Sequence, residues 1–185
     1  EAGTMAMIHL EPQTLEMFSR ALDGLKPPPN LSLSQWADKY RKLSAEASAS
    51  QGQWNTDAAP FQREIMDAIG DVHIRKVVAM MCAQAGKTEG LILNTIGFYM
   101  SYHPASIMVM QPTVNLGESF SKDRLTPMLR DTPALRGLVN TKSRYSGNTI
   151  SKKNFPGGML VIVGANAPTD LRSRPIKVLL ADEVD

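Results

Sequence analysis

The sequence predicts an α/β fold in which a mostly parallel sheet is covered by helices on both faces. Short apolar runs alternate with helical segments along most of the chain. These runs are continuously apolar, which is typical of strands buried on both faces. The chain has 185 residues, 43% of them hydrophobic and 21% charged, which is enough for one globular domain with a buried core. We therefore expect one main domain, preceded by a small helical segment.

The first part of the chain is expected to be helical. Residues 1–30 are predicted to form a separate N-terminal region, with a helix at 12–22 and a stiff proline-rich linker at 26–30. The main domain, residues 31–185, then begins with two helices and a polar loop. These are a helix at 34–43 capped by Ser32 or Ser34, the loop at 45–55, and a helix at 60–69 that begins at Pro60 and closes at Gly70.

From residue 74 onward the apolar runs favour strands. The predicted strands cover residues 74–81, 106–110, 144–150, 159–163 and 177–181, with a turn at Pro156-Gly157-Gly158 between the third and the fourth. The predicted helices cover residues 88–101 and 115–130, and the second is expected to kink or break near Pro127. Because few residues follow the last strand, we expect the domain to be incomplete at its C-terminus.

Charge and cysteine content narrow the class of protein. The net charge of +2 is too small to indicate nucleic-acid binding by the whole chain. The stretch from Arg136 to Lys177 is basic, with Asp170 as its one acidic residue, and is either a solvated surface or a basic face close to a phosphate site. The one cysteine, Cys82, permits no disulfide within the chain, and no apolar run is long enough to span a membrane.

A phosphate-binding loop is predicted at Gly86-Lys87-Thr88, where a strand passes into a helix. Backbone N–H groups and the helix N-terminus bind phosphates in such a place, Lys87 would reach the β and γ phosphates of ATP, and Thr88 would place its hydroxyl on Mg²⁺. The strict pattern has glycine where this chain has Met81, so the prediction depends on the strand before, the helix after and a matching carboxylate strand. The predicted nucleotide-binding residues of this segment are Gln84, Ala85, Gly86, Lys87, Thr88 and Glu89.

The matching carboxylates are Asp182 and Glu183, which follow the last apolar run. Asp182 would hold Mg²⁺, directly or through water, and Glu183 would orient and activate the attacking water. Taken alone, two such carboxylates indicate only a helix cap or a solvated turn. Paired with the phosphate loop, they predict a P-loop NTPase-type domain, ASCE-like, that carries the Walker A and Walker B motifs and hydrolyses ATP with Mg²⁺.

Two glutamines are further candidates for the site. Gln62 follows Pro60-Phe61, and its amide either contacts the adenine edge or is simply an exposed helix side chain. Gln111 begins the segment Gln111-Pro112-Thr113 after the predicted strand at 106–110, at the carboxyl edge where such sheets bind ligands. The three histidines have no metal-ligand spacing, so no zinc site is expected.

Several of these segments resemble the N-terminal ATPase region of phage terminase large subunits of the lambda-like GpA family. The resemblance covers about residues 31–185 and lies in the segments 33–38, 52–54, 60–67, 84–89, 111–113 and 171–175, the last leading to 182–185. In that family the phosphate loop deviates from the strict pattern, which accounts for Met81. The resemblance implies that Gln62 belongs to an adenine-contacting motif and that Arg172 and Arg174 sense phosphate or contact DNA.

The resemblance also implies a DNA-packaging motor with several partners. ATP hydrolysis would drive double-stranded viral DNA through the portal protein into the procapsid, with a terminase small subunit helping to select the DNA. The active form would be a homo-oligomeric ring in the host cytoplasm, encoded by a phage or prophage and absent from the mature virion. The endonuclease of this family, which cuts concatemeric DNA, would lie beyond Asp185.

Two other functions fit part of the pattern. A superfamily 2-like DNA helicase or translocase ATPase shares the sheet and both motifs, and a strand-separation assay would discriminate, because a packaging motor moves duplex DNA without opening it. A binding or assembly module with an inactive nucleotide site is disfavoured, because both Lys87 and Glu183 are present.

Overall fold

The computed structural model describes residues 11, 13–18, 30–46, 51–139, 147–166 and 175–183. The chain divides into two units, residues 1–30 and 31–185. In the first unit residues 13–18 are helical, and the other positions of the helix predicted at 12–22 lie outside the described residues.

The second unit begins with α2 (Leu33–Tyr40), whose start is fixed by a capping box. The hydroxyl of Ser32 accepts the backbone N–H of Gln35, and the side chain of Gln35 accepts the backbone N–H of Ser32. The helix ends before the predicted residue 43, because Arg41 has an extended backbone that leads into a strand. The elements that follow are β1 (Lys42–Leu43), antiparallel to β2 (Gly52–Gln53), the 3₁₀ turn η1 (Thr56–Ala58) and α3 (Gln62–Gly70).

Both predicted helices of the second half of the chain are present. The first comprises a π-helical part, η2 (Thr88–Leu93), and α4 (Asn94–Ser101). The second has three parts: α5 (Val114–Phe120), the π-helical η3 (Ser121–Leu125) and α6 (Thr126–Asp131). In place of the expected kink or break near Pro127, the structure has a change of helix type without a gap, from the π-helical η3 to α6 at Thr126. Pro127 lies in the first turn of α6, where its missing N–H is tolerated.

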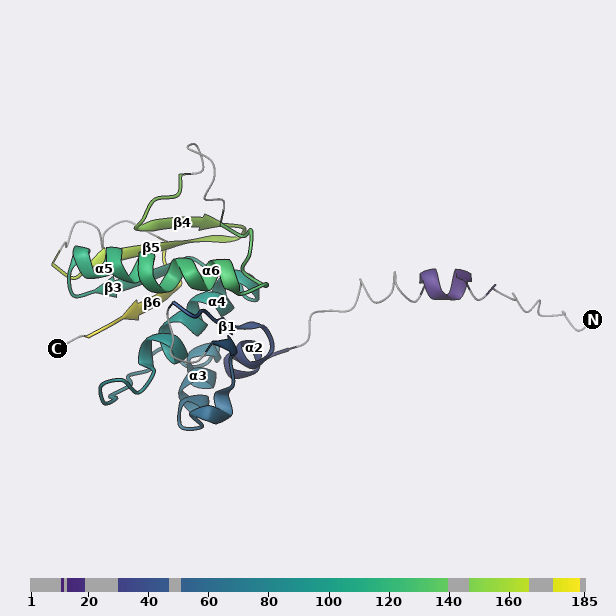
Figure 1. The fold of residues 1–185 in the computed structure, drawn as a ribbon, viewed down its shortest axis with the longest axis horizontal. Helices are drawn as coiled ribbons and strands as arrows, with labels where there is room; N and C mark the ends of the chain where they lie inside the picture. Colours follow the sequence, from purple (N-terminus) through teal and green to yellow (C-terminus); the bar gives the residue numbers. More distant parts are fainter. Residues whose placement is uncertain are drawn as a thin grey trace, which may run out of the picture. The chain divides into compact units, whose positions relative to one another are not determined.

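The central sheet has four strands in the order β4-β5-β3-β6 (Figure 1). They are β4 (Lys152–Phe155), β5 (Gly158–Gly164), β3 (Ile107–Gln111) and β6 (Val178–Ala181). β3 is parallel to both of its neighbours, β5 and β6, and β4 is antiparallel to β5. The sheet is therefore mostly parallel, and the carboxyl ends of β3 and β6 meet at one edge, where Met110 lies opposite Ala181.

The strand predicted at 144–150 is wrong. Residues 147–151 form no strand, residues 144–146 lie outside the described part of the chain, and the strand lies instead at β4. The reason is the turn. Pro156 and Gly157 form a two-residue connection in which Gly157 has a φ of +86°, and this sets Phe155 directly opposite Gly158. Pairing between β4 and β5 therefore starts at the turn, and the residues just before the turn form β4.

The main hydrophobic core lies between one face of the sheet and the helices. Side chains one residue apart point to opposite faces of a strand, so Ile107 and Val109 share a face while Met108 points away from it. The main cluster includes Ile107, Val109, Leu160 and Ile162 of the sheet with Trp36, Leu93, Ile96, Phe98, Phe120, Leu125 and Met128 of the helices. The second cluster contains Met108, Val161 and Val163, packed with Met110, Met159 and Ile176.

This division corrects the expectation of helices on both faces. In the part of the chain that the structure describes, every helical side chain of the two clusters belongs to the main one, and the second cluster contains side chains from strands and from Ile176. Figure 1 shows α5 running alongside β3 and β5. Described helices thus cover one face of the sheet.

The strand predicted at 74–81 is also wrong. These residues have no regular secondary structure, and each of residues 71–80 is exposed. The run has strand-forming side chains, but a strand also needs a neighbour to accept its backbone hydrogen bonds. Among the described strands β6 pairs with β3 alone, and no described strand pairs with residues 74–81. The phosphate loop therefore follows an extended, exposed segment in this structure.

Candidate phosphate and nucleotide site

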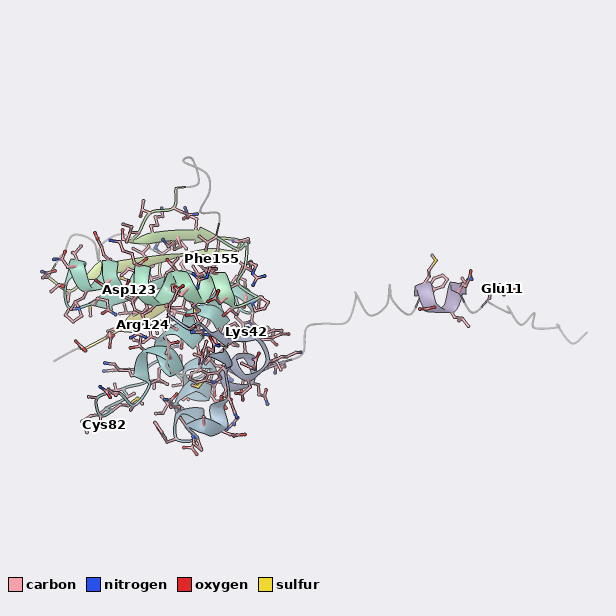
Figure 2. All side chains as sticks on the ribbon, in the orientation of Figure 1. Glu11, Lys42, Cys82, Asp123, Arg124 and Phe155 are labelled. Atoms are coloured by element: carbon pink, nitrogen blue, oxygen red, sulfur yellow. The ribbon has the colours of Figure 1, made fainter. Side chains whose placement is uncertain are left out.

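The predicted phosphate loop turns sharply before it enters η2. Two of its residues have left-handed backbones, Gln84 with φ +60° and Gly86 with φ +77°. Alternating right- and left-handed residues turn successive N–H groups toward one concave side, which favours an anion. The carbonyl of Gly86 accepts the N–H of Gly90 at 2.7 Å, so the helix begins inside the motif. Figure 2 shows Cys82 on the loop that precedes it, where its side chain is exposed.

The loop lysine contacts the carboxylate of the last strand. The Nζ atom of Lys87 lies 2.7 Å from Oδ1 of Asp182, and the Asp182 side chain is largely buried. The structure thus brings together the two motifs that are about a hundred residues apart in the sequence.

Asp182 is held in place by the neighbouring strand. Its backbone N–H donates to the carbonyl of Met110 at 2.9 Å, which continues the pairing of β6 with β3 by one residue. Its second carboxylate oxygen, Oδ2, accepts a hydrogen bond from Nε2 of Gln111 at 3.2 Å. The two oxygens of Asp182 thus have different contacts: Oδ1 forms an ion pair with the Lys87 ammonium, and Oδ2 accepts a hydrogen bond from the Gln111 amide.

Gln62 lies beneath the phosphate loop. Gln62 as a whole is only 2% exposed, and its Nε2 donates to the carbonyl of Ala85 at 2.6 Å. The amide fills the space between two glycines, since a Cβ on Gly90 would lie 1.9 Å from its Oε1 and a Cβ on Gly86 would lie 2.9 Å from its Nε2. The alternative of an exposed helix glutamine is therefore wrong. The structure places the amide against the loop backbone, and contact with adenine stays a prediction.

The carboxylate of Glu89 takes part in an ion-pair network. Its Oε2 lies 2.6 Å from a guanidinium nitrogen of Arg41, and its Oε1 lies 3.7 Å from Arg124, which is labelled in Figure 2. Burial raises the pKa of the Glu89 carboxyl, and Arg41 and Arg124 partly oppose this rise. Burial likewise lowers the pKa of the Arg41 guanidinium, against the pull of Glu89 and Asp131. The pair joins the end of α2 to the first turn of η2.

For the other predicted site residues that the structure describes, it gives position and exposure but no side-chain hydrogen bond or ion pair with the phosphate loop or with Asp182. Thr88 is half-buried in the first turn of η2, directly after Lys87. Glu183 is exposed beside Asp182 and has a left-handed backbone with φ +52°. Arg172 and Arg174 lie outside the described residues.

The donor chemistry of this edge suits a hard divalent cation bound with phosphate. Magnesium prefers oxygen ligands and commonly uses one or two protein oxygens together with substrate phosphates. Asp182 supplies a carboxylate, and the ammonium of Lys87 already stands beside it as a cation. No group of three or more His, Cys, Asp or Glu side chains that could hold a metal by themselves occurs in the described part of the chain.

Two residues of this region were not assigned a role by the sequence. Arg41 lies in a polar run, Lys39-Tyr40-Arg41-Lys42, and nothing in that run indicates that one of its cations is buried. The sequence places Gln111 after a predicted strand, but the contact with Asp182 depends on the strand order, which the sequence does not show. Register between β3 and β6 is the missing information in the second case.

A phosphate-type loop at a helix start, its lysine paired with a carboxylate at the end of a parallel strand, defines an α/β domain built to bind a phosphorylated ligand. The chain belongs to the family described as the ATPase domain of the phage terminase large subunit gpA, whose model matches residues 48–185.

Two curated relatives are similar over most of this chain. The terminase large subunit of Enterobacteria phage P21 is 31% identical over 159 residues, which cover 85% of this chain and 24% of that protein. The terminase large subunit of Escherichia phage lambda is 30% identical over 173 residues, which cover 92% of this chain and 26% of that protein. The chain thus spans about a quarter of the length of these relatives. No solved structure matches it significantly. No helix in the described residues is both long and apolar enough to cross a membrane.

Proposed function

We propose that this chain is the ATP-hydrolysing motor part of a phage terminase large subunit, which drives double-stranded viral DNA into the procapsid. The single observation that carries the proposal is the pairing of Lys87 with Asp182 at 2.7 Å, because it joins the phosphate loop to the carboxylate edge of the sheet. Membership of the terminase ATPase-domain family supports the same reading.

Lys87 is the residue that responds to ATP. One carboxylate holds its ammonium in this structure, and the β and γ phosphates together carry more negative charge than one carboxylate. We expect Lys87 to turn from Asp182 to these phosphates, while the loop N–H groups around Gly86 hold them by hydrogen bonds. Lys87 would then stabilise the charge that develops on the transferring phosphoryl group.

Asp182 and Thr88 would hold Mg²⁺, directly or through water, once Lys87 has moved. The ion, when bound, neutralises charge on the phosphate oxygens. Glu183 follows Asp182 directly and is exposed, so its carboxylate can reach a water molecule outside the buried core. We assign it the role of orienting that water and accepting its proton.

The remaining site residues have supporting roles in this proposal. Gln62 contacts the adenine and, through Ala85, the loop that binds the phosphates. Gln84, Ala85 and Glu89 shape the loop, Glu89 through its pair with Arg41. Arg172 and Arg174 either sense phosphate or contact DNA.

The partners and location follow from the family and belong to the whole protein. They comprise double-stranded DNA, a terminase small subunit, the portal protein of the procapsid and further copies of the same chain in a ring. The full-length protein would also carry an endonuclease for concatemeric DNA and would act in the host cytoplasm.

Substitution of the loop lysine tests the proposal. Lys87→Ala in the full-length protein should abolish ATP turnover, because no other cation of the described site is placed to neutralise the phosphates. Lys122→Ala is the matched control, since that exposed lysine also pairs with a carboxylate, but its partner Glu118 lies four residues before it and not in either motif. Turnover by Lys87→Ala within twofold of the wild-type rate would contradict the proposal. Separation of DNA strands by the wild-type protein would favour the helicase alternative.

A further inference from the structure

The side chain of Gln111 is placed where it can control the carboxylate of Asp182. Gln111 is the last residue of β3, and Asp182 is the first residue after β6, so the two occupy neighbouring positions on paired parallel strands. The side chain of Gln111 is buried, with Gln111 as a whole 6% exposed, and its Nε2 donates to Oδ2 of Asp182 at 3.2 Å. The opposite oxygen, Oδ1, faces the ammonium of Lys87.

The backbone keeps Gln111 in this place. Its carbonyl accepts the N–H of Ala165 at 2.8 Å, which ties it to the end of β5, and its neighbour Met110 accepts the N–H of Asp182. Gln111 is thus linked to the strands on both sides of β3 at their carboxyl ends. These backbone bonds fix the position from which the Gln111 side chain starts, and its amide restrains the Asp182 carboxylate through the hydrogen bond to Oδ2.

The amide of Gln111 and the ammonium of Lys87 both contact Asp182, but they differ in charge. The amide donates a hydrogen bond but has no charge, so it does not compete with a cation for Asp182. Lys87 can leave Oδ1, whereas Gln111 can remain on Oδ2 throughout. A hydrogen bond to a charged group is stronger than one between neutral groups, which makes this contact a useful constraint on orientation.

We propose that Gln111 is a positioning residue of the nucleotide site, which fixes the plane of the Asp182 carboxylate so that Oδ1 faces whichever cation stands there. That cation is Lys87 in this structure and would be Mg²⁺ when it arrives with a nucleotide. The inference rests on the proposed function, because it takes Asp182 to be the carboxylate that holds the metal.

The test measures nucleotide affinity with and without Mg²⁺, so that the part of the affinity that depends on the metal can be distinguished from the rest. A fluorescent, non-hydrolysable ATP analogue is titrated into the full-length protein, once with Mg²⁺ and once with EDTA. Gln111→Met removes the amide at nearly constant volume, and it should reduce the affinity gained from Mg²⁺ about tenfold, the scale of one hydrogen bond to a charged group. Affinity in EDTA should change less than twofold, because the loop and Lys87 are untouched.

Two further variants guard against a loss of folding. Gln111→Asn keeps a polar amide in the buried place but is one methylene too short to reach Asp182, so it should act like Gln111→Met. Met110→Leu changes the adjacent residue, whose side chain packs in the second hydrophobic cluster, and should leave both affinities within twofold of wild type. If Met110→Leu weakens Mg²⁺-dependent binding as much as Gln111→Met does, general disturbance of β3 explains the effect and the inference is overturned.

A double substitution decides whether Gln111 acts through Asp182. Asp182→Asn already removes the carboxylate, so adding Gln111→Met should lower the Mg²⁺-dependent affinity by less than a further twofold. A further tenfold loss would show that Gln111 acts independently and would overturn the inference. If wild-type protein gains no affinity from Mg²⁺, the proposed function itself fails. If wild type gains affinity and Gln111→Met gains just as much, the inference alone fails.

Discussion

Replacing Arg41 with methionine should destabilise the domain by about 3 kcal/mol, even though Arg41 lies outside the proposed set of phosphate-binding residues. Arg41 is 1% exposed in its side chain, and its guanidinium lies 2.6 Å from Glu89, whose side chain is 15% exposed. Methionine fills similar space without a charge. The substitution therefore leaves the Glu89 carboxylate in a largely buried place without its main partner.

The magnitude follows from the environment of Glu89. Breaking a buried ion pair by removing one member costs about 3–5 kcal/mol, because the remaining charge is desolvated and uncompensated. Two features place this case at the lower end. Glu89 keeps some contact with solvent, and Arg124 lies 3.7 Å from its other oxygen. The hydrogen bond that Arg41 donates to the carbonyl of Lys42 is lost as well.

The loss should also depend on pH, in a direction set by the Glu89 carboxyl. Burial raises the pKa of Glu89 above its ordinary value of 4.5, and Arg41 is the larger of the two opposing influences. Without Arg41 this pKa rises further. Between 4.5 and the raised value the folded state binds more protons than the unfolded state, so stability falls as pH rises through that window. The difference between Arg41→Met and wild type should therefore be smaller near pH 5 than near pH 8.

Urea denaturation of the 185-residue chain, followed by circular dichroism at pH 5 and pH 8, measures both effects. Arg63→Met serves as the matched control, because Arg63 pairs with Asp57 and Asp38 but is 38% exposed, and exposed pairs contribute less than about 1 kcal/mol. The double variant Arg41→Met with Glu89→Gln should recover part of the loss, since it removes the stranded charge. An equal loss at both pH values, or a loss no larger than that of Arg63→Met, would refute this reasoning.

Two further predictions concern the site itself. Glu183→Gln should retain Mg²⁺-dependent nucleotide binding while slowing hydrolysis by at least ~10²-fold, the usual scale for loss of a general base, whereas Asp182→Asn should mainly weaken the Mg²⁺-dependent part of binding. Titrations with and without Mg²⁺ together with turnover rates separate the two, and reversed phenotypes would mean that the roles are exchanged. Gly90→Ala should displace the Gln62 amide, because the new Cβ would lie 1.9 Å from its Oε1, and the lost hydrogen bond to Ala85 should cost about 1 kcal/mol in thermal unfolding. In a Gln62→Ala background the same change should cost much less, and an equal cost in both backgrounds would show that Gln62 is not the obstacle.

Local signals in the sequence predicted the helices well. The Ser32 cap, Pro60, and the proline in the second long helix each act within one turn of the chain, and the structure has helices beginning close to each of them. The sequence also predicted the turn at Pro156-Gly157. Glycine adopts the positive φ that such a turn needs, and this preference depends on that one residue alone. The strand before that turn was misplaced, since its position depends on pairing across the turn and not on its own residues.

In the candidate site, only residues that belong to a sequence motif could be predicted. Lys87 and Asp182 could be singled out because phosphate binding and metal binding require those residue types after a strand, and the structure brings them to one edge. The buried position of Arg41 and the contact of Gln111 with Asp182 had no such signature. Both arise from tertiary packing: one from how α2 docks on η2, and the other from which strand lies beside β6.

In the segment before the phosphate loop, apolar composition failed to predict whether the residues form a buried strand. Val77, Val78 and Met80 have the character of a buried strand, yet all are exposed, while β6 is paired on one side and has Leu179 exposed. Burying one such side chain is worth about 1.5–3 kcal/mol, so the sequence favours burial but does not say against what. Pairing requires a free row of backbone groups at the right distance, which is a property of the sheet edge and not of the run itself. The loop that follows this segment is nevertheless fixed at its far end, because Gln62 holds Ala85 and Asp182 holds Lys87. The geometry of the site therefore depends on these two contacts, whatever the backbone before Cys82 does.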